Sequence, residues 1–230
     1  MKDLGAVNYI LGMEIKRYRA KRKLWLNQRK YVETILQMFN MQDSKLVKVL
    51  IPIGVKLSAK QCPKTQEEEE DLSRVPYASA VGSLMYAMVY TRPNIAHEVA
   101  VLSRFMSKPR KEHWTAVKQV FRYLRGTSEY GLCYQRRRGL DRVLDIHGFV
   151  DVNWTEDLDK RRSTSGYVFN LFGGAVSWMS KCYTGIVSTR MLLFPLKWVA
   201  ILETNNKSLL LFPFIKIDEE EQEDQPESCA

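Results

Sequence analysis

The sequence predicts an α/β fold in which a β-hairpin and a helix come first, a small helical unit follows, and a sheet of sequential strands comes last. Apolar residues alternate with polar ones near the start of the chain, recur at helical spacing in its middle, and alternate again beyond Gly131. Of the 230 residues, 45% are hydrophobic and 27% are charged, which is ordinary usage for a globular protein. This length is sufficient for one large domain or two small ones with a hydrophobic core.

The first predicted element is a hairpin. Residues 7–15 alternate between apolar and polar side chains, which is the period of a half-buried strand. A basic run at 16–23 and the apolar residues 24–26 follow, which predicts a second strand behind a charged hairpin tip. Asn27 is a suitable N-cap for a helix that we expect to end near Asn40.

Residues 42–72 show neither period. They carry Pro52, Pro63 and the acidic run 67–71, which together are typical of a linker that leads into a helix.

Three segments with helical spacing follow the linker. The first extends over about 77–88 and the third over about 114–126, where Gly126 is a suitable end. Thr91 and Pro93 fit the N-terminal signals of the second, whose apolar stripe runs over 95–106.

The period then changes to that of strands. Residues 144–152, 163–171 and 175–180 are three expected strands, and Gly173-Gly174 is a suitable tight turn between the last two. Short connections between sequential strands predict an antiparallel meander. Beyond Tyr183 the signals conflict, and no element is assigned there.

The charge is distributed unevenly. The chain has 35 basic and 26 acidic residues, and residues 218–227 hold seven acids and no base. Residues 1–217 therefore carry a net charge of +16, against +9 for the whole chain. A basic body favours a polyanionic partner, with the acidic tail as a solvated or self-shielding segment. The alternative is an ordinary basic protein without such a partner.

Several function classes are not supported by the sequence. No apolar run approaches the roughly 18 residues of a membrane span, and the first five residues hold no secretory signal. We therefore expect an intracellular protein, cytoplasmic or nuclear, that is not secreted and has no membrane partner. The four cysteines and three histidines show no zinc-ligand spacing, and His113 is expected to be a packing or surface residue.

Asp151 is the candidate catalytic and metal-binding residue. It stands between Val150 and Val152 where an apolar strand ends, and an acid in such a run is costly unless it is paired or metal-bound. The alternative is an edge-strand aspartate that faces water or pairs with the basic residues 160–162. Hydrolysis with two Mg²⁺ ions needs several converging carboxylates, and one strand supplies one.

A candidate nucleic-acid surface lies on the third predicted helix. Lys118, Arg122 and Arg125 stand at i, i+4 and i+7, on a face beside the apolar stripe. Such a face suits phosphate backbones, and the alternative is a solvated helix face.

A series of motifs resembles the copia-type retrotransposon Pol polyproteins over about residues 1–189, in the order of that family. The motifs of the first part are Met1–Gly5, Tyr9–Ile15, Gln28–Tyr31, Tyr77–Tyr86, Thr91–Ala96 and Arg122–Thr127. In the second part Asp151-Val152-Asn153-Trp154 resembles the family's DADW motif, and Arg161–Tyr167 and Gly173–Trp178 follow as in its ribonuclease H region.

The resemblance implies five segments. Residues 1–41 would be the end of a reverse transcriptase, 42–72 a linker and 73–128 a helical connector. Residues 129–189 would be a partial ribonuclease H-like domain with an incomplete mixed sheet, and 190–230 a divergent C-terminus with an acidic tail. Leu11 and Gly12 would lie in the hairpin that steadies the primer end.

The resemblance also implies Mg²⁺ as the cofactor, with Asp151 as the first of its carboxylate ligands. Two departures from the family pattern bear on activity. The polymerase motif YxDD does not occur in this sequence, so we expect no polymerase activity. After Ser188-Thr189 the family carries a helix with a glutamate, whereas here Arg190 follows and Pro195 would disturb a helix.

We therefore expect that Mg²⁺ binding and cleavage are not retained, and that Asp151 is vestigial. We hypothesise that a frameshift or an altered splice near codon 189 replaced the C-terminus. Translation of the genomic DNA in the other frames tests this, because one frame should encode a glutamate-containing segment like that of the family.

Three functions are consistent with these observations. The first is a truncated transposable-element fragment whose ancestor bound RNA–DNA hybrid and cleaved its RNA strand. The second is a non-catalytic nucleic-acid-binding module, and the third a degenerate product without a selected function. The partners implied are RNA–DNA hybrid or another nucleic acid, and other Pol or Gag products of a retroelement.

Overall fold

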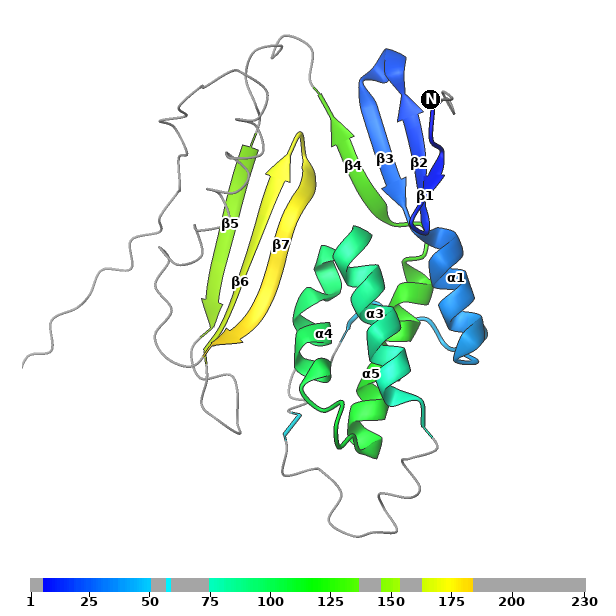
Figure 1. Cartoon of the computed structure of the whole chain (residues 1–230), viewed down its shortest axis with the longest axis vertical. Coiled ribbons are helices and arrows are strands. Elements are labelled where there is room, and N and C mark those ends of the chain that lie inside the picture. The colour runs from blue at the N-terminus through cyan, green and yellow to red at the C-terminus, as the bar shows by residue number, and fades with distance from the viewer. Residues whose placement is uncertain (1–5, 51–56, 59–74, 137–145, 154–162, 184–230) are drawn as a thin grey trace, which may run out of the picture.

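The computed structural model describes residues 6–50, 57–58, 75–136, 146–153 and 163–183. Within these ranges the chain forms two antiparallel sheets and four α-helices, which confirms the mixed α/β class (Figure 1). The other residues, among them most of the predicted linker and all of 184–230, lie outside the described part of the chain.

The first sheet has the strand order β1-β2-β3-β4. Its strands are β1 (Tyr9–Ile10), β2 (Met13–Tyr18), β3 (Lys23–Asn27) and β4 (Gly131–Gln135). The prediction of one strand over 7–15 is wrong, because the chain reverses at Leu11 and Gly12. Both have positive φ angles, 49° and 71°, as a two-residue hairpin turn requires.

The predicted hairpin of β2 and β3 is confirmed. The basic run does not lie wholly at its tip, since Lys16 and Arg17 belong to β2. The tip itself is a short 3₁₀ turn, Arg19–Lys21, followed by Arg22 in the left-handed region with φ 48°.

Helix α1 (Arg29–Met38) begins one residue later than the sequence predicts, because Gln28 and not Asn27 stands at the N-cap position and Asn27 ends β3. The Asn27 side-chain oxygen accepts the backbone N–H of Arg29 at 2.5 Å, which satisfies one of the unpaired donors of the first turn. The helix ends two residues before Asn40, which has a positive φ of 53°.

The helical unit comprises α3 (Tyr77–Thr91), the 3₁₀ turn η3 (Pro93–Ile95), α4 (Ala96–Ser103) and α5 (Lys111–Gly126). The three predicted helices are present, and the end at Gly126 is confirmed. The role of Thr91 as an N-cap is wrong, because Thr91 is the last residue of α3. Its hydroxyl donates a hydrogen bond to Gln28 Oε1 at 2.6 Å instead.

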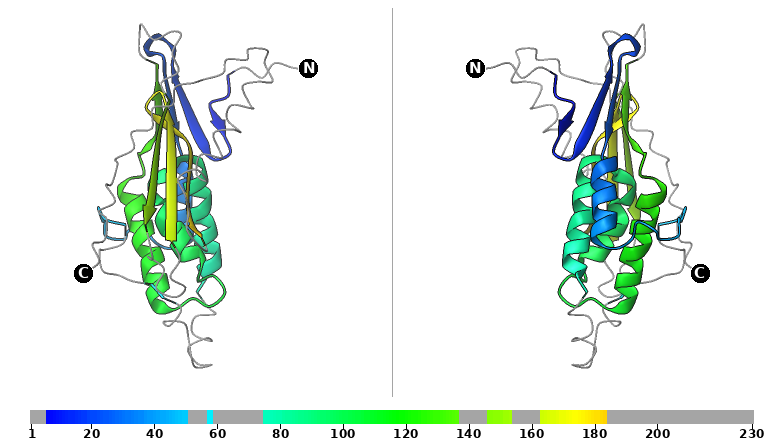
Figure 2. Two further views of the ribbon diagram at one scale, coloured as in Figure 1. Left: turned by 90° about the vertical axis from the view of Figure 1, so that its left-hand side faces the viewer. Right: turned by 90° about the vertical axis from the view of Figure 1, so that its right-hand side faces the viewer.

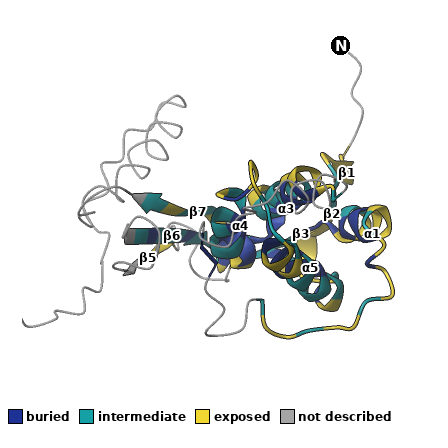
Figure 3. Cartoon of the chain, turned by 90° about the horizontal axis from the view of Figure 1, so that it is seen from below, coloured by how far each residue is buried: buried dark blue, intermediate teal, exposed yellow. Residues whose placement is uncertain are grey.

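All four helices share one hydrophobic core. Val32, Leu84, Leu102 and Phe121, one from each helix, are fully buried in it. Coloured by burial, the molecule shows its buried residues where the helices face one another (Figure 3). The amphipathic spacing that predicted these helices is therefore the spacing of their core contacts.

The second sheet is the predicted antiparallel meander. It consists of β5 (Ile146–Asn153), β6 (Ser163–Leu171) and β7 (Gly174–Tyr183), in the order β5-β6-β7. The turn between the last two strands is Phe172-Gly173 and not Gly173-Gly174, because Phe172 and Gly173 have the positive φ angles, 51° and 82°.

Strand β4 contacts both sheets. The sequence groups it with the later strands, but it pairs with β3, with Trp25 opposite Cys133. It also meets the start of β7, where the Tyr134 hydroxyl donates to the carbonyl of Ala175 at 2.6 Å. The first sheet extends from one end of the helical unit, whereas the second sheet also lies alongside α4 (Figure 1 and Figure 2).

Candidate nucleic-acid interface

The turn at Leu11 and Gly12 is exposed to solvent on one side and contacts helix α3 on the other. A leucine in the left-handed region costs about 1 kcal/mol, so its surroundings must fix it there. The Tyr86 hydroxyl of α3 donates a hydrogen bond to the Leu11 carbonyl at 2.9 Å. The Leu11 side chain is 57% exposed, so the turn presents it to solvent.

Tyrosine side chains of α1 and α3 support this turn. The Tyr31 and Tyr86 rings have centroids 4.9 Å apart, and those of Tyr86 and Tyr90 are 4.5 Å apart. The Tyr31 hydroxyl donates to the Ser83 carbonyl at 3.0 Å, and burial raises the pKa of Tyr31. The sequence gives no signal for this support, because tyrosines at helical spacing are usual core residues.

Exposed aromatic and basic side chains lie beside the turn. Tyr9 is half exposed, and the Lys30 ammonium lies 5.6 Å from the centroid of its ring. An exposed ring next to a cation suits stacking on a nucleic-acid base together with a phosphate contact. Sequence reasoning found no such exposed ring among the charged residues, because the pairing depends on how β1 packs against α1.

The structure brings Lys118, Arg122 and Arg125 onto one face of α5, and all three side chains are half-buried. The Arg125 guanidinium donates to the carbonyl of Ser44. Gln119 Nε2 donates to the carbonyl of Val49 at 3.2 Å, so residues 44–50 pack against this part of α5. The role of the three residues in binding nucleic acid stays a prediction.

Asp151 lies in β5 opposite Gly166 of β6, and its side chain is exposed. Paired Mg²⁺ ions require several carboxylates on one site. In the part of the chain that the structure describes, no three His, Cys, Asp or Glu side chains lie close enough to hold a metal ion. The described residues therefore do not make up the ligand set of such a site. The nearby acids Glu156, Asp157 and Asp159 lie outside the described residues.

A buried arginine fixes the junction between α5 and β4. Arg92 is 1% exposed and donates to the carbonyls of Thr127 and Ser128, at 2.7 and 3.2 Å. These carbonyls follow the C-terminus of α5, where a cation is favoured by the helix dipole. Burial lowers the pKa of Arg92 to about 10, so the guanidinium stays charged at pH 7. Its motif resembles the family's, but no local signal indicates burial.

His113, expected to be a packing or surface residue, is fully buried and therefore a packing residue. Its Nδ1 accepts the backbone N–H of Arg110 at 3.0 Å at the start of α5. Its ring stacks on Phe105, with centroids 4.0 Å apart. This residue closes the loop between α4 and α5.

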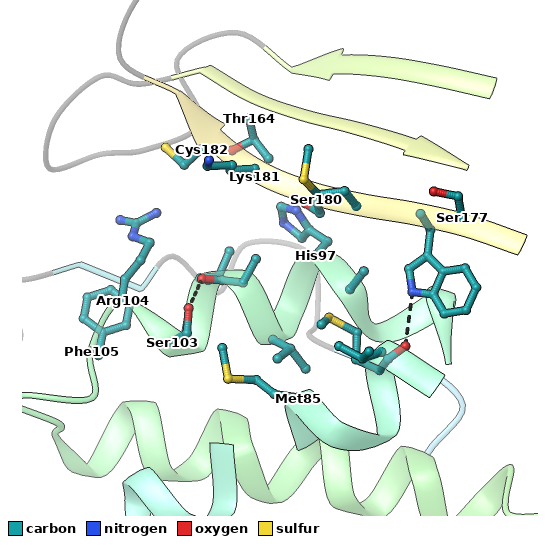
Figure 4. Close-up of a pocket in the computed structure, with 18 of the residues that line it drawn as sticks. Met85, His97, Ser103, Arg104, Phe105, Thr164, Ser177, Ser180, Lys181 and Cys182 are labelled. Carbon is teal, nitrogen blue, oxygen red and sulfur yellow. Dashed lines mark hydrogen bonds between the residues drawn. The ribbon is translucent and has the colours of Figure 1, made fainter. Parts of the chain in front are cut away.

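A pocket of about 860 Å³ lies between the helical unit and the second sheet. Its apolar part includes Met85 and Trp178, and the Trp178 indole N–H donates to the Met88 carbonyl at 3.1 Å. Figure 4 shows His97 of α4 between the helix and strand β7, near Ser180. Sequence reasoning did not find this pocket, because its residues come from α3, α4, β6 and β7.

No described helix is both long enough and apolar enough to span a membrane. Comparison with known protein families gives no matching family model, and no solved structure matches the chain.

Comparison with curated proteins gives clear relatives. The chain is 47% identical over 216 residues to the "Retrovirus-related Pol polyprotein from transposon TNT 1-94" of Nicotiana tabacum, a match that covers 94% of this chain and 16% of the relative. It is 35% identical over 187 residues to the Pol polyprotein from transposon RE1 of Arabidopsis thaliana, which covers 81% of this chain and 12% of the relative.

A shorter relative matches part of the chain. The "Secreted RxLR effector protein 161" of Plasmopara viticola is 51% identical over 110 residues, which is 48% of this chain and 75% of that protein. The chain spans less than a fifth of each Pol polyprotein, yet most of its own length matches both. It therefore belongs to the family of retrovirus-related Pol polyproteins of copia-type transposons.

Proposed function

We propose that this chain holds an RNA–DNA hybrid, or another nucleic acid, mainly through the phosphate backbone and does not cut it. The observation that carries the proposal is the exposed Leu11–Gly12 turn, fixed from behind by the Tyr86 hydroxyl. Membership of the Pol family and a net charge of +9 support it. Association with other Pol or Gag products stays a prediction.

The turn is suited to contact a nucleic-acid strand because its Leu11 side chain is exposed and the Tyr86 hydroxyl holds its backbone. A Cβ at Gly12 would lie 3.7 Å from the Tyr86 ring, an ordinary contact, so its positive φ and not lack of space favours glycine there. Tyr9 and Lys30 beside the turn add a ring and a cation to the same surface.

A binding titration tests the proposal. Fluorescence anisotropy of a labelled RNA–DNA hybrid should show binding. The logarithm of the binding constant should fall linearly with the logarithm of the salt concentration. The Gly12→Val variant should bind more weakly, because valine is strained at a positive φ and the turn loses its shape. Absence of hybrid binding at low salt would contradict the proposal.

We propose separately that the chain does not cleave the RNA strand, although its family's ancestral nuclease did. It is supported by the departure from the family pattern after Thr189. RNA cleavage in the presence of Mg²⁺ should not exceed background for the wild type or for Asp151→Asn. Cleavage by the wild type that Asp151→Asn abolishes would show that the nuclease is retained.

A further inference from the structure

A cationic groove lies at the tip of the β2–β3 hairpin, at the far end of β2 from the Leu11–Gly12 turn. We call it the tip groove, and its volume is about 360 Å³. It is lined by Arg17, Arg19, Arg22, Lys23, Leu24, Tyr134, Arg136 and Phe172.

Three segments that are distant in sequence build the tip groove. The backbone N–H of Arg136, just after β4, donates to the Arg22 carbonyl at 3.1 Å. The N–H of Gln135 donates to the carbonyl of Phe172, in the turn between β6 and β7, at 3.0 Å. The Arg136 guanidinium lies 5.9 Å from the centroid of the Phe172 ring. The groove therefore requires the pairing of β4 with β3, which the sequence did not predict.

The described residues that line the tip groove carry charge of one sign only. Five of its eight lining residues are basic, and none of the eight is acidic. A second pocket along the same sheet, of about 520 Å³, contains Glu14, Glu33 and Glu129 among its lining residues. There the charges are paired, with 2.8 Å between Arg29 and Glu33 and 3.3 Å between Lys16 and Glu14. Among the described lining residues, the tip groove therefore has five basic side chains and no acid, whereas the second pocket has three acids beside its basic side chains.

This arrangement favours a polyanion as the ligand. A groove whose described lining is rich in basic side chains attracts a polyanion through its positive potential. Four of the five basic residues are arginines, whose planar guanidinium group matches the oxygens of a phosphate in two parallel hydrogen bonds. The repeated phosphates of a nucleic-acid backbone provide such oxygens at regular spacing.

We infer that the tip groove binds the phosphate backbone of the same nucleic acid that contacts the Leu11–Gly12 turn. The inference rests on the proposed function and adds a second contact surface to it. Strand β2 has six residues, so the two surfaces are separated by about 20 Å. At about 3.4 Å per nucleotide of a strand, a segment of about six nucleotides spans both.

A pair of charge-matched variants tests the inference. Arg19→Glu with Arg136→Glu reverses two charges in the groove, where both side chains are exposed. Lys108→Glu with Lys111→Glu makes the same change of net charge at the start of α5, whereas the other end of α5 leads to β4. This helix has 16 residues and is therefore about 24 Å long.

We expect the groove variant to bind hybrid at least tenfold more weakly than the wild type, with a salt slope smaller by about two, as for two lost phosphate contacts. The control variant should retain the slope of the wild type. The milder Arg19→Gln with Arg136→Gln should lose part of the affinity, and a melting curve confirms that each variant is folded.

The outcomes are distinguishable. If the wild type does not bind hybrid, both the proposed function and the inference are wrong. If the wild type binds but the groove and control variants weaken binding equally, the tip groove is not a contact surface and the proposed function stands. Loss of affinity and of slope in the groove variant alone supports the inference.

Discussion

The Tyr86 hydroxyl ties the Leu11–Gly12 turn to the helical unit by a hydrogen bond to the Leu11 carbonyl. It holds a leucine in a conformation that leucine rarely adopts, with φ at 49°. The ring of Tyr86 packs between those of Tyr31 and Tyr90, so the hydroxyl is held in place. The turn is therefore a preformed surface.

The Tyr86→Phe variant tests this contact. Removal of the hydroxyl should lower the free energy of unfolding by about 1 kcal/mol and weaken hybrid binding, because the turn becomes mobile. Urea denaturation and hybrid titration measure the two effects. Tyr18→Phe, at the exposed end of β2, is the control and should change stability by less than about 0.5 kcal/mol. Equal effects of the two substitutions would contradict the role of Tyr86.

A buried tyrosine gives the chain a predictable alkaline response. The Tyr77 hydroxyl donates to the Leu102 carbonyl at 2.9 Å, and burial raises its pKa well above the ordinary value of 10.0. As the pH rises through 10, the unfolded chain loses this proton while the folded chain retains it. The folded state therefore loses stability above about pH 10.

The Tyr77→Phe variant should show a weaker loss of stability with rising pH than the wild type. The lowered pKa of Arg92 makes the folded state more stable as the pH rises above about 10, which opposes the effect of Tyr77. Both chains contain Arg92, so the difference between the wild type and Tyr77→Phe isolates the effect of Tyr77. Urea denaturation between pH 8 and pH 11 measures the difference. Parallel stability curves for the two chains would show that Tyr77 does not titrate differently in the folded state.

At the scale of elements, local sequence patterns predict the helices and the strands, but they do not predict which distant strands pair. The helices and the β5–β7 meander follow from spacing that a short window shows. The pairing of β4 with β3 joins residues more than 100 positions apart, and nothing in either strand specifies it. Thr91, two residues before Pro93, matches a helix-start signal, but it is a buried residue of the last turn of α3.

The candidate site shows the same division. The family resemblance led to Leu11 and Gly12, and their turn has a clear physical basis in two positive φ angles. The support from Tyr86 and the tip groove depend on contacts between elements, so no sequence window contains them. The acidic neighbours of Asp151 lie outside the described residues, so the inactivity of the nuclease stays a prediction.

Two glycines give a sharp test of the β3–β4 pairing. A Cβ at Gly131 would lie 2.3 Å from the Leu26 carbonyl oxygen and 2.6 Å from the Trp25 indole nitrogen, closer than atoms can approach. Gly131→Ala should therefore destabilise the fold by about 2 kcal/mol, as in other overpacked sites.

Gly82→Ala is the matched control. Gly82 lies in α3 with open space around it, and alanine should stabilise that helix by about 0.5–1 kcal/mol. Chemical denaturation of both variants measures the two changes. If Gly131→Ala is as stable as the wild type, β3 and β4 do not approach as closely as the structure has them.

At the scale of the whole molecule, the helices and the two sheets are joined by packing contacts. The helical core is shared by all four helices, and β4 and Trp178 attach the second sheet to the rest. We expect one cooperative thermal transition from this arrangement. A broad, non-cooperative transition would favour the degenerate product without a selected function.

The acidic tail should oppose nucleic-acid binding. Deletion of residues 218–230 removes seven acids and no base, so the net charge rises from +9 to +16. The shortened chain should bind hybrid more tightly at low salt, and the difference should shrink as salt screens the charges. Replacement of the seven acids by amides in the full chain should have the same effect. Unchanged affinity would show that the tail does not interact with the basic body.

The most direct test of the account follows the fate of the hybrid after it has bound. A hybrid labelled on its RNA strand is titrated with the chain in Mg²⁺, its anisotropy is recorded, and the RNA is then analysed on a denaturing gel. We predict saturable, salt-sensitive binding with RNA of full length. RNA fragments that disappear with Asp151→Asn, or a hybrid that stays free at every protein concentration, would contradict it.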